Sequence, residues 1–233
     1  MPNFIDMTID EKVLKKFYNI ITESKQEKYD QIAADRTRYL TVVMESISKE
    51  HNSSAVLRTC DCFGIQDLHT IEKGNFIHDP MRDIALGAGN WVDLHTYTEG
   101  NNPSIECLNK LKKEGYKIIA TTPHTDKDIN DIKIVQPIAL VFGTEKTGIS
   151  KEVEAMADEL VKIPMYGFTE SFNISVSAAV ALNILRNKLE QTSLPWKLSK
   201  EEQIKLKIQW SSKIIKDGEN VEKEIRRRAL SEG

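Results

Sequence analysis

The spacing of apolar residues predicts helices near both ends of the chain. Between residues 10 and 35 they recur at intervals of three and four, which is the period of one or two amphipathic helices. The same spacing returns over residues 200–216, after a break at Pro195. A turn over residues 217–220 then leads into a charged end.

The middle of the chain alternates short β-branched apolar runs with helical patterns. Strands are predicted at 40–44, 68–71, 91–97, 117–121, 138–142 and 160–163. Helices are predicted from a cap at Asn52 or Ser53 and over 104–114, 150–157 and 174–189. This alternation is typical of an α/β fold with a mainly parallel sheet flanked by helices. We therefore expect an N-terminal helical segment over 1–39, a central domain over 40–191 and a C-terminal helical extension over 192–233.

Composition places the chain among globular proteins. Of its 233 residues 40% are hydrophobic, and no run approaches the roughly 18 apolar residues of a membrane span. We expect a soluble, cytoplasmic protein without a membrane partner. The 32 Lys and Arg against 35 Asp and Glu give a net charge of −3, so any RNA site must be a local patch. Cys60, Cys62 and Cys107 are expected to be reduced structural thiols.

Common cofactor and metal motifs are missing from the chain. Gly87-Ala88-Gly89 is the only G-x-G, and it lacks both the third glycine and a clear preceding strand, so a dinucleotide fingerprint is not supported. The sequence contains no P-loop, no H-E-x-x-H and no His or Cys cluster. We therefore expect no bound metal.

The segment from His51 to Cys60 has an outward arginine near a helix start. Val56 and Cys60 belong to a core-facing stripe, and Arg58 lies about 200° around the helix from Val56. An outward arginine near a helix N-terminus can bind a phosphate through two hydrogen bonds. A solvated helix arginine beside an ordinary Asn cap is the alternative interpretation.

Two later segments place polar residues directly after predicted strands. The strand ending at Phe142 is followed by Gly143 and Glu145, at the sheet edge where α/β proteins bind ligands. Further on, Ser171, Asn173 and Ser175 crowd one helix start, although capping needs a single residue. A plain strand-to-helix connection, and one cap with incidental neighbours, remain the alternatives.

In this order, the three segments resemble the motifs of the SPOUT superfamily of RNA 2′-O-ribose methyltransferases. The resemblance is closest to the TrmH branch, which methylates the D-loop guanosine of tRNA at position 18. It extends from about Leu40 to Arg186. It rests on His51-Asn52-x-Ser54-Ala55-x-x-Arg58-Thr59, on Phe142-Gly143-x-Glu145-Lys146-x-Gly148-Ile149, and on Ile163-Pro164-Met165-x-Gly167 with Ser171-x-Asn173-x-Ser175-Val176.

The resemblance implies a homodimer that binds S-adenosylmethionine in a C-terminal trefoil knot, with tRNA crossing the subunit interface. The implied catalytic residues are Asn52, Arg58, Glu145, Ser171 and Asn173. The implied cofactor-binding residues are Thr121, Gly143, Ile163 and Phe172. The chain departs from the family at Phe172, Glu170 and Glu50, where Leu, Gln and Pro are usual.

Arg58 is expected to hold the substrate 5′-phosphate and to stabilise the developing alkoxide, because a guanidinium stays protonated. The resemblance implies that the matching arginine also takes part in removing the hydroxyl proton. Because a guanidinium stays protonated, we leave the final proton acceptor unassigned.

RNA affinity is expected from cations outside the pocket. The candidates are Arg36, Arg38, His51 and the tail from Lys197, which holds ten Lys and Arg against seven acidic residues. Solvated helix faces are the alternative.

Three other functions stay open at this stage. They are 2′-O-methylation of ribosomal RNA or of the tRNA wobble nucleotide, RNA binding without catalysis, and a nicotinamide-dependent reaction.

Overall fold

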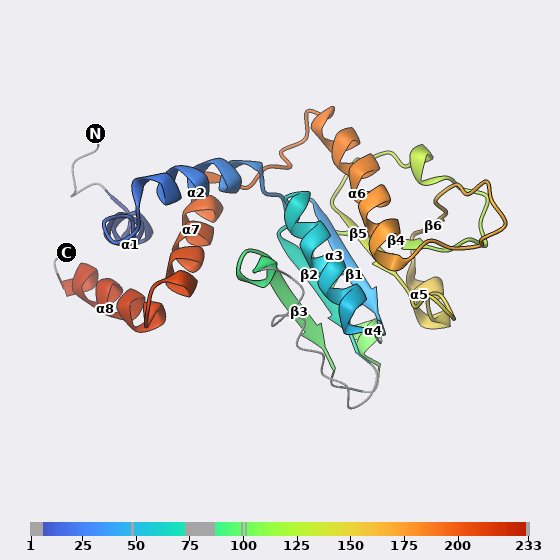
Figure 1. Cartoon of the computed structure of the whole chain (residues 1–233), viewed down its shortest axis with the longest axis horizontal. Coiled ribbons are helices and arrows are strands. Elements are labelled where there is room, and N and C mark those ends of the chain that lie inside the picture. The colour runs from blue at the N-terminus through green and yellow to red at the C-terminus, as the bar shows by residue number, and fades with distance from the viewer. Residues whose placement is uncertain (1–6, 48, 73–86, 99, 101, 232–233) are drawn as a thin grey trace. The chain divides into compact units, whose positions relative to one another are not determined.

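The computed structural model describes residues 7–47, 49–72, 87–98, 100 and 102–231 and divides the chain into two compact units (Figure 1). One unit comprises residues 37–196. The other combines residues 1–36 with residues 197–233, so the two terminal helical segments belong to one unit.

A six-stranded parallel sheet forms the centre of the unit 37–196. The strand order is β3-β2-β1-β5-β4-β6, and every neighbouring pair runs parallel, which confirms the expected α/β fold. The central strands β1 and β5 are buried along their whole length. The strands are β1 Leu40–Glu45, β2 Asp67–Ile71, β3 Asp93–Tyr97, β4 Lys117–Thr121, β5 Ile138–Phe142 and β6 Glu159–Val161.

Helices cover both faces of this sheet, because successive strand residues point to opposite sides. Val42 and Leu140 pack in one apolar cluster with α3 (Glu50–Cys62) and α6 (Ile174–Glu190). Val43 and Val141 pack in the other cluster, with α4 (Pro103–Lys113) and α5 (Lys151–Met156). The described residues of this unit also include the short 3₁₀ helices η2 (Ala88–Asn90) and η3 (Ile129–Asp131).

Helix α3 begins earlier than its sequence predicts. The expected cap was Asn52 or Ser53, but Lys49 occupies the N-cap position, and its carbonyl accepts hydrogen bonds from the backbone N–H groups of both residues. Asn52 therefore lies inside the first turn and is 5% exposed. Its side-chain amide is not used as a cap and is available to another part of the chain.

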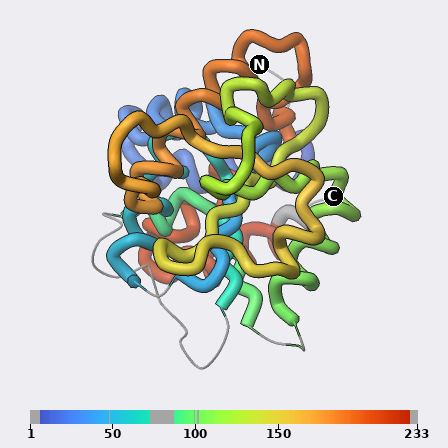
Figure 2. The backbone as a smooth tube through the Cα atoms, turned by 90° about the vertical axis from the view of Figure 1, so that its right-hand side faces the viewer, coloured from blue at the N-terminus to red at the C-terminus, as the bar shows by residue number. Residues whose placement is uncertain are grey.

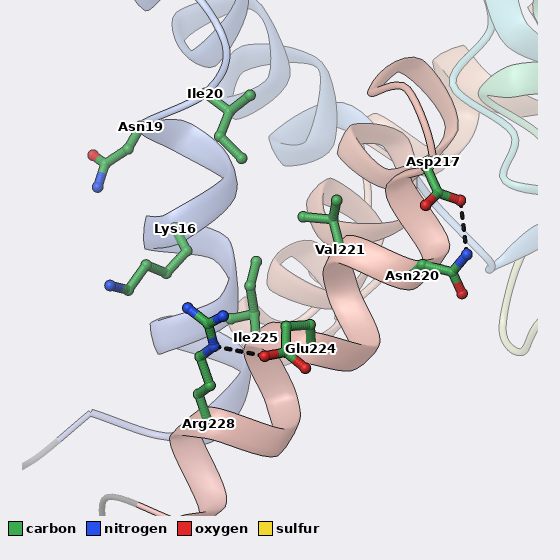
Figure 3. Close-up of a pocket in the computed structure, with 9 residues that line it drawn as sticks. All are labelled: Lys16, Asn19, Ile20, Asp217, Asn220, Val221, Glu224, Ile225 and Arg228. Carbon is green, nitrogen blue, oxygen red and sulfur yellow. Dashed lines mark hydrogen bonds and ion pairs between the residues drawn. The ribbon is translucent and has the colours of Figure 1, made fainter.

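The terminal unit is built from four helices: α1 Ile9–Tyr18, α2 Glu23–Asp35, α7 Lys200–Ile214 and α8 Gly218–Ser231. The predicted helices at 10–35 and 200–216 are present, and the charged end also folds as a helix. A groove of about 540 Å³ runs between α1 and α8, with Ile20, Val221 and Ile225 in its lining (Figure 3). Within the described part of the chain, no helix combines the length and apolar composition that crossing a membrane requires.

A cluster of polar side chains lies on β2 and β3. Asp67 is buried, and its carboxylate accepts hydrogen bonds from Arg38 and, at 2.8 Å, from Nε2 of His95. The His69 ring stacks on His95 with 4.6 Å between centroids. Burial, together with the neighbouring His95, lowers the pKa of His69 to about 3. His69 is therefore neutral in the folded protein near neutral pH.

The neutral state of His69 predicts that the fold is sensitive to acid. Unfolding returns the His69 pKa to about 6.5, so below that pH the unfolded chain binds a proton that the folded chain excludes. We expect the free energy of unfolding, measured by urea titration, to fall by about 2 kcal/mol between about pH 7 and about pH 5. His69→Gln should remove this loss, whereas His51→Gln, at an exposed histidine, should retain it. An unchanged pH dependence in His69→Gln would contradict the assignment.

Candidate active site

The site lies at the carboxyl edge of the sheet. Strands β5, β4 and β6 are consecutive in the sheet, and residues 143–149 follow β5 while residues 162–173 follow β6. Parallel strands end at the same edge, so segments distant in sequence start side by side. The course of the backbone through these segments can be followed in the yellow and orange parts of the tube in Figure 2.

Residues 143–149 form a tightly closed loop. The backbone N–H of Thr144 donates to the carbonyl of Gly148 at 2.9 Å, and the N–H of Gly148 donates back to Thr144 at 3.0 Å. A Cβ on Gly143 would lie 2.1 Å from the carbonyl carbon of Gly148, so this position has no room for a side chain. The loop thereby presents Glu145 at its tip.

The carboxylate of Glu145 joins three segments of the chain. Its Oε1 accepts hydrogen bonds from Nδ2 of Asn52 at 3.0 Å and from Nδ2 of Asn173 at 2.9 Å. Its Oε2 accepts from Nζ of Lys49 at 3.1 Å. Asn52 and Glu145 are 93 residues apart in sequence, so the cluster exists only in the folded chain. We call Lys49, Asn52, Glu145 and Asn173 the Glu145 cluster.

Asn173 is oriented by its role as the N-cap of α6. Its Oδ1 accepts hydrogen bonds from the backbone N–H of Ser175 at 2.9 Å and from the Ser175 hydroxyl at 2.6 Å. Capping therefore turns the amide NH₂ group towards Glu145 and towards Oδ1 of Asn52, which it meets at 3.1 Å. Ser171 is exposed and makes no hydrogen bond within the described residues.

The neighbours of Glu145 favour its charged form. The hydrogen bond from Lys49 holds the pKa of Glu145 below its usual range, assisted by the positive charge of Lys49, by Asn52 and by the backbone N–H of Ile174. Glu145 is therefore ionised at neutral pH and acts as a hydrogen-bond acceptor. Sequence reasoning missed Lys49. The only available signal was its position just before the His51-Asn52 motif.

Arg58 does not join the Glu145 cluster within one chain. It is exposed on α3 and makes no hydrogen bond or ion pair within the described residues. It follows Asn52 by six positions, which places it about 9 Å further along the helix and about 120° around it. The side chain is therefore free to meet a ligand or a second copy of the chain.

The four expected cofactor residues lie at or beyond the ends of the three neighbouring strands. Thr121 ends β4 and donates its hydroxyl to the carbonyl of Val141 at 3.1 Å. Gly143 follows β5, and Ile163 and Phe172 follow β6, with Phe172 42% exposed. Backbone groups at the strand ends, beside the apolar side chains of Ile163 and Phe172, suit a cofactor that carries an adenine ring. Among the described residues, no three His, Cys, Asp or Glu side chains gather as a metal site would require.

The structure corrects the expectation that Arg36 contacts RNA. Arg36 is 1% exposed, and its guanidinium lies 5.5 Å from the ring centroid of Trp210, so its charge is enclosed within the terminal unit. Arg38 is partly exposed, but its guanidinium already binds Asp67 and Asp93. His51 is exposed, as an RNA contact requires.

The cations of the tail are largely paired with acidic residues. Arg226 binds Asp10 and Glu222, while Arg227 and Arg228 both bind Glu224. Lys197, Lys205 and Lys207 also form ion pairs, so at least six of the ten cations of the tail are paired.

Comparison with protein-family models identifies the class. A model described as the SpoU rRNA Methylase family matches residues 39–183, which is more than half of the chain. The chain therefore belongs to the SpoU methylase family and is a methyltransferase, which confirms the resemblance seen in the sequence motifs. Enzymes of this family use S-adenosylmethionine as the methyl donor.

Individual relatives give a finer comparison. The chain is 36% identical over 219 residues to a tRNA (guanosine(18)-2'-O)-methyltransferase of Borreliella burgdorferi, covering 92% of this chain and 98% of that protein. It is 35% identical over 162 residues to the enzyme of the same name from Thermus thermophilus, covering 69% and 81%. The crystal structure of the Aquifex aeolicus TrmH/SpoU tRNA modifying enzyme is similar, with a TM-score of 0.74 and 28% identity, covering 83% of this chain and 98% of that one.

The backbone of Gly148 lies so close to Gly143 that we predict that no residue with a side chain can replace Gly143. In Gly143→Ala the new Cβ would force apart the pairing of Thr144 with Gly148, so we expect at least about 2 kcal/mol of lost unfolding free energy and most of the methyl transfer to disappear. The matched control is Gly148→Ala. Its Cβ would meet nothing within 4 Å, so it carries only the cost of a positive φ, about 1 kcal/mol. Equal losses of stability and activity in the two variants would refute the steric argument.

Proposed function

We propose that this enzyme transfers a methyl group from S-adenosylmethionine to the ribose 2′-hydroxyl of a tRNA guanosine, at position 18 of the D-loop. The observation that carries the proposal is the meeting of Asn52, Glu145 and Asn173, one residue from each sequence motif, in one hydrogen-bonded cluster. The full-length similarity to the Borreliella burgdorferi enzyme of that name supports the choice of substrate.

The proposed mechanism rests on positioning. Thr121, Gly143, Ile163 and Phe172 would hold S-adenosylmethionine, which would supply a methyl group bonded to a positively charged sulfur. The amide groups of the Glu145 cluster would orient the ribose, and Ser171 at the same helix start offers a further hydroxyl. Holding two reactants in alignment can supply much of the rate enhancement.

Arg58 is assigned to the substrate phosphate. Its guanidinium stays protonated, so it would hold the 5′-phosphate and stabilise the negative charge that develops on the ribose oxygen. Glu145 is a weak base because its pKa is lowered, so it is not assigned the proton.

We also propose that the enzyme works as a homodimer in the cytoplasm and that its C-terminal part carries the trefoil knot of the superfamily. The family resemblance supports the knot. The exposed position of Arg58, outside the cluster of its own chain, supports an assembly in which a second copy completes each site. In that arrangement the tRNA would cross the boundary between the two copies, and His51 would lie near its path.

The proposed activity is tested by supplying radiolabelled S-adenosylmethionine and total RNA from a strain that lacks the enzyme. We expect label in tRNA, at the 2′-oxygen of the D-loop guanosine, because the Borreliella burgdorferi relative of that name covers 92% of this chain. Label in ribosomal RNA, or at the wobble nucleotide of tRNA, would show that the enzyme methylates that RNA position and not the D-loop guanosine. Unlabelled RNA would indicate a binding protein without catalysis.

The role of Arg58 predicts the behaviour of Arg58→Ala. This variant should lose transfer at least about a hundredfold, because the phosphate and the developing charge lose their cation. Its affinity for S-adenosylmethionine, measured by calorimetry, should stay near that of the wild type. Lys113→Ala, which removes an exposed charge from α4 on the other face of the sheet, should remain active. Undiminished turnover in Arg58→Ala would refute the assignment.

A further inference from the structure

A buried carboxylate lies at the end of the central strand β1. Glu45 is the last residue of β1 and is 3% exposed. Its Oε2 accepts a hydrogen bond from the backbone N–H of Ser150 at 2.8 Å, and its Oε1 accepts from the Ser150 hydroxyl at 2.6 Å. The hydroxyl of Ser104, near the start of α4, also donates to Oε1 at 2.6 Å. A buried carboxylate is costly unless such donors surround it, so this position has a specific structural purpose.

Glu45 lies between two of the three segments that form the Glu145 cluster. On one side, the chain turns at Ser46, which has a φ of 55° and donates its N–H to the carbonyl of Ile71 at 2.7 Å. Three residues beyond that turn, Lys49 starts α3 and places Asn52. On the other side, Ser150 directly follows the loop 143–149 that presents Glu145. One carboxylate therefore holds the far end of that loop against the strand that leads to Asn52.

The large separation of Glu45 and Ser150 in the sequence shows why the hydrogen bonds between them matter. Glu45 and Ser150 are 105 residues apart. Lys49 and Asn52 follow Glu45 by four and seven residues, and Glu145 precedes Ser150 by five. The loop is closed at its base by the Thr144 and Gly148 pairing, so its conformation is fixed internally. Its placement relative to Asn52 depends on anchors outside the loop, and the two hydrogen bonds from Ser150 are such an anchor.

We propose that Glu45 is a positioning residue for methyl transfer, acting through Ser150 to hold Glu145 in register with Asn52 and Asn173. The proposal rests on the proposed function, since it concerns the same site. Glu45 itself is buried beneath the loop and is assigned no contact with substrate or cofactor.

The two serine partners of Glu45 allow a matched comparison. The hydrogen bond from Ser150 connects Glu45 to the loop that carries Glu145. The hydrogen bond from Ser104 connects Glu45 to α4, which packs on the other face of the sheet. Both side chains donate to the same carboxylate oxygen at the same distance, and alanine removes one hydroxyl in each case. Ser150 also caps α5, accepting from the N–H of Val153 at 3.3 Å, so stability must be measured beside activity.

The experiment compares Ser150→Ala, Ser104→Ala and Glu45→Gln with the wild-type enzyme, well below the unfolding temperature of each. We expect kcat to fall about tenfold or more in Ser150→Ala and Glu45→Gln, with KM for S-adenosylmethionine changed less than about threefold. Ser104→Ala should keep kcat within about twofold even where its thermal midpoint falls. Ser150→Thr, which retains the hydroxyl, should restore turnover. A wild-type kcat in Ser150→Ala, or equal losses in the two alanine variants, would overturn the proposal.

A second measurement separates this inference from the proposed function. NMR signals of the side-chain amide protons of Asn52 and Asn173 report on their hydrogen bonds to Glu145 without any methyl transfer. Their chemical shifts should move in Ser150→Ala and stay at the wild-type values in Ser104→Ala. A wild-type enzyme that methylates no RNA would refute the proposed function, whereas an active wild type with unchanged amide shifts in Ser150→Ala would refute the role of Glu45.

Discussion

The hydrogen bonds that Asn52 and Asn173 donate to the Glu145 carboxylate hold together the part of the molecule on which its chemistry depends. They join a helix start, a strand-end loop and a second helix start. They are possible because the strands of the sheet run parallel, so that the segments after β1, β5 and β6 leave from one edge. The sheet supplies the common edge, and the carboxylate supplies the shared acceptor.

This acceptor also limits the chemistry available to the site. A glutamate that receives hydrogen bonds from Lys49 and two amides stays ionised and is a poor proton acceptor. The carboxylate fixes the orientation of the amide groups of Asn52 and Asn173. Catalysis by alignment and charge stabilisation, with Arg58 as the cation, agrees with this environment better than general base catalysis does.

The arginines proposed as RNA contacts show that tertiary contacts decide whether a positive side chain is available to a ligand. Arg36 lies beside Trp210 in the interior of the terminal unit, and Arg38 is bound by two aspartates. Three consecutive arginines near the end of the chain are matched by nearby acids. Arg36 is buried, Arg38 is paired between strands, and Arg227 and Arg228 form exposed pairs within α8. A count of positive residues along a segment does not distinguish these uses from RNA binding.

The sequence by itself determined the order and type of most elements, because periods of two and of three to four residues are local properties of a strand or a helix. All six predicted strands are present, with ends that differ by about two residues or fewer. The motif residues at 52, 58, 145 and 173 could also be predicted from the sequence, because the spacing of the motifs resembles that of a known family. Tertiary structure alone decided that α3 starts at Glu50, that Lys49 binds Glu145, that Arg36 is buried and that Glu45 holds Ser150. Each of these depends on a partner far along the chain, and hydrogen bonding and burial become defined only when the backbone has brought such partners together.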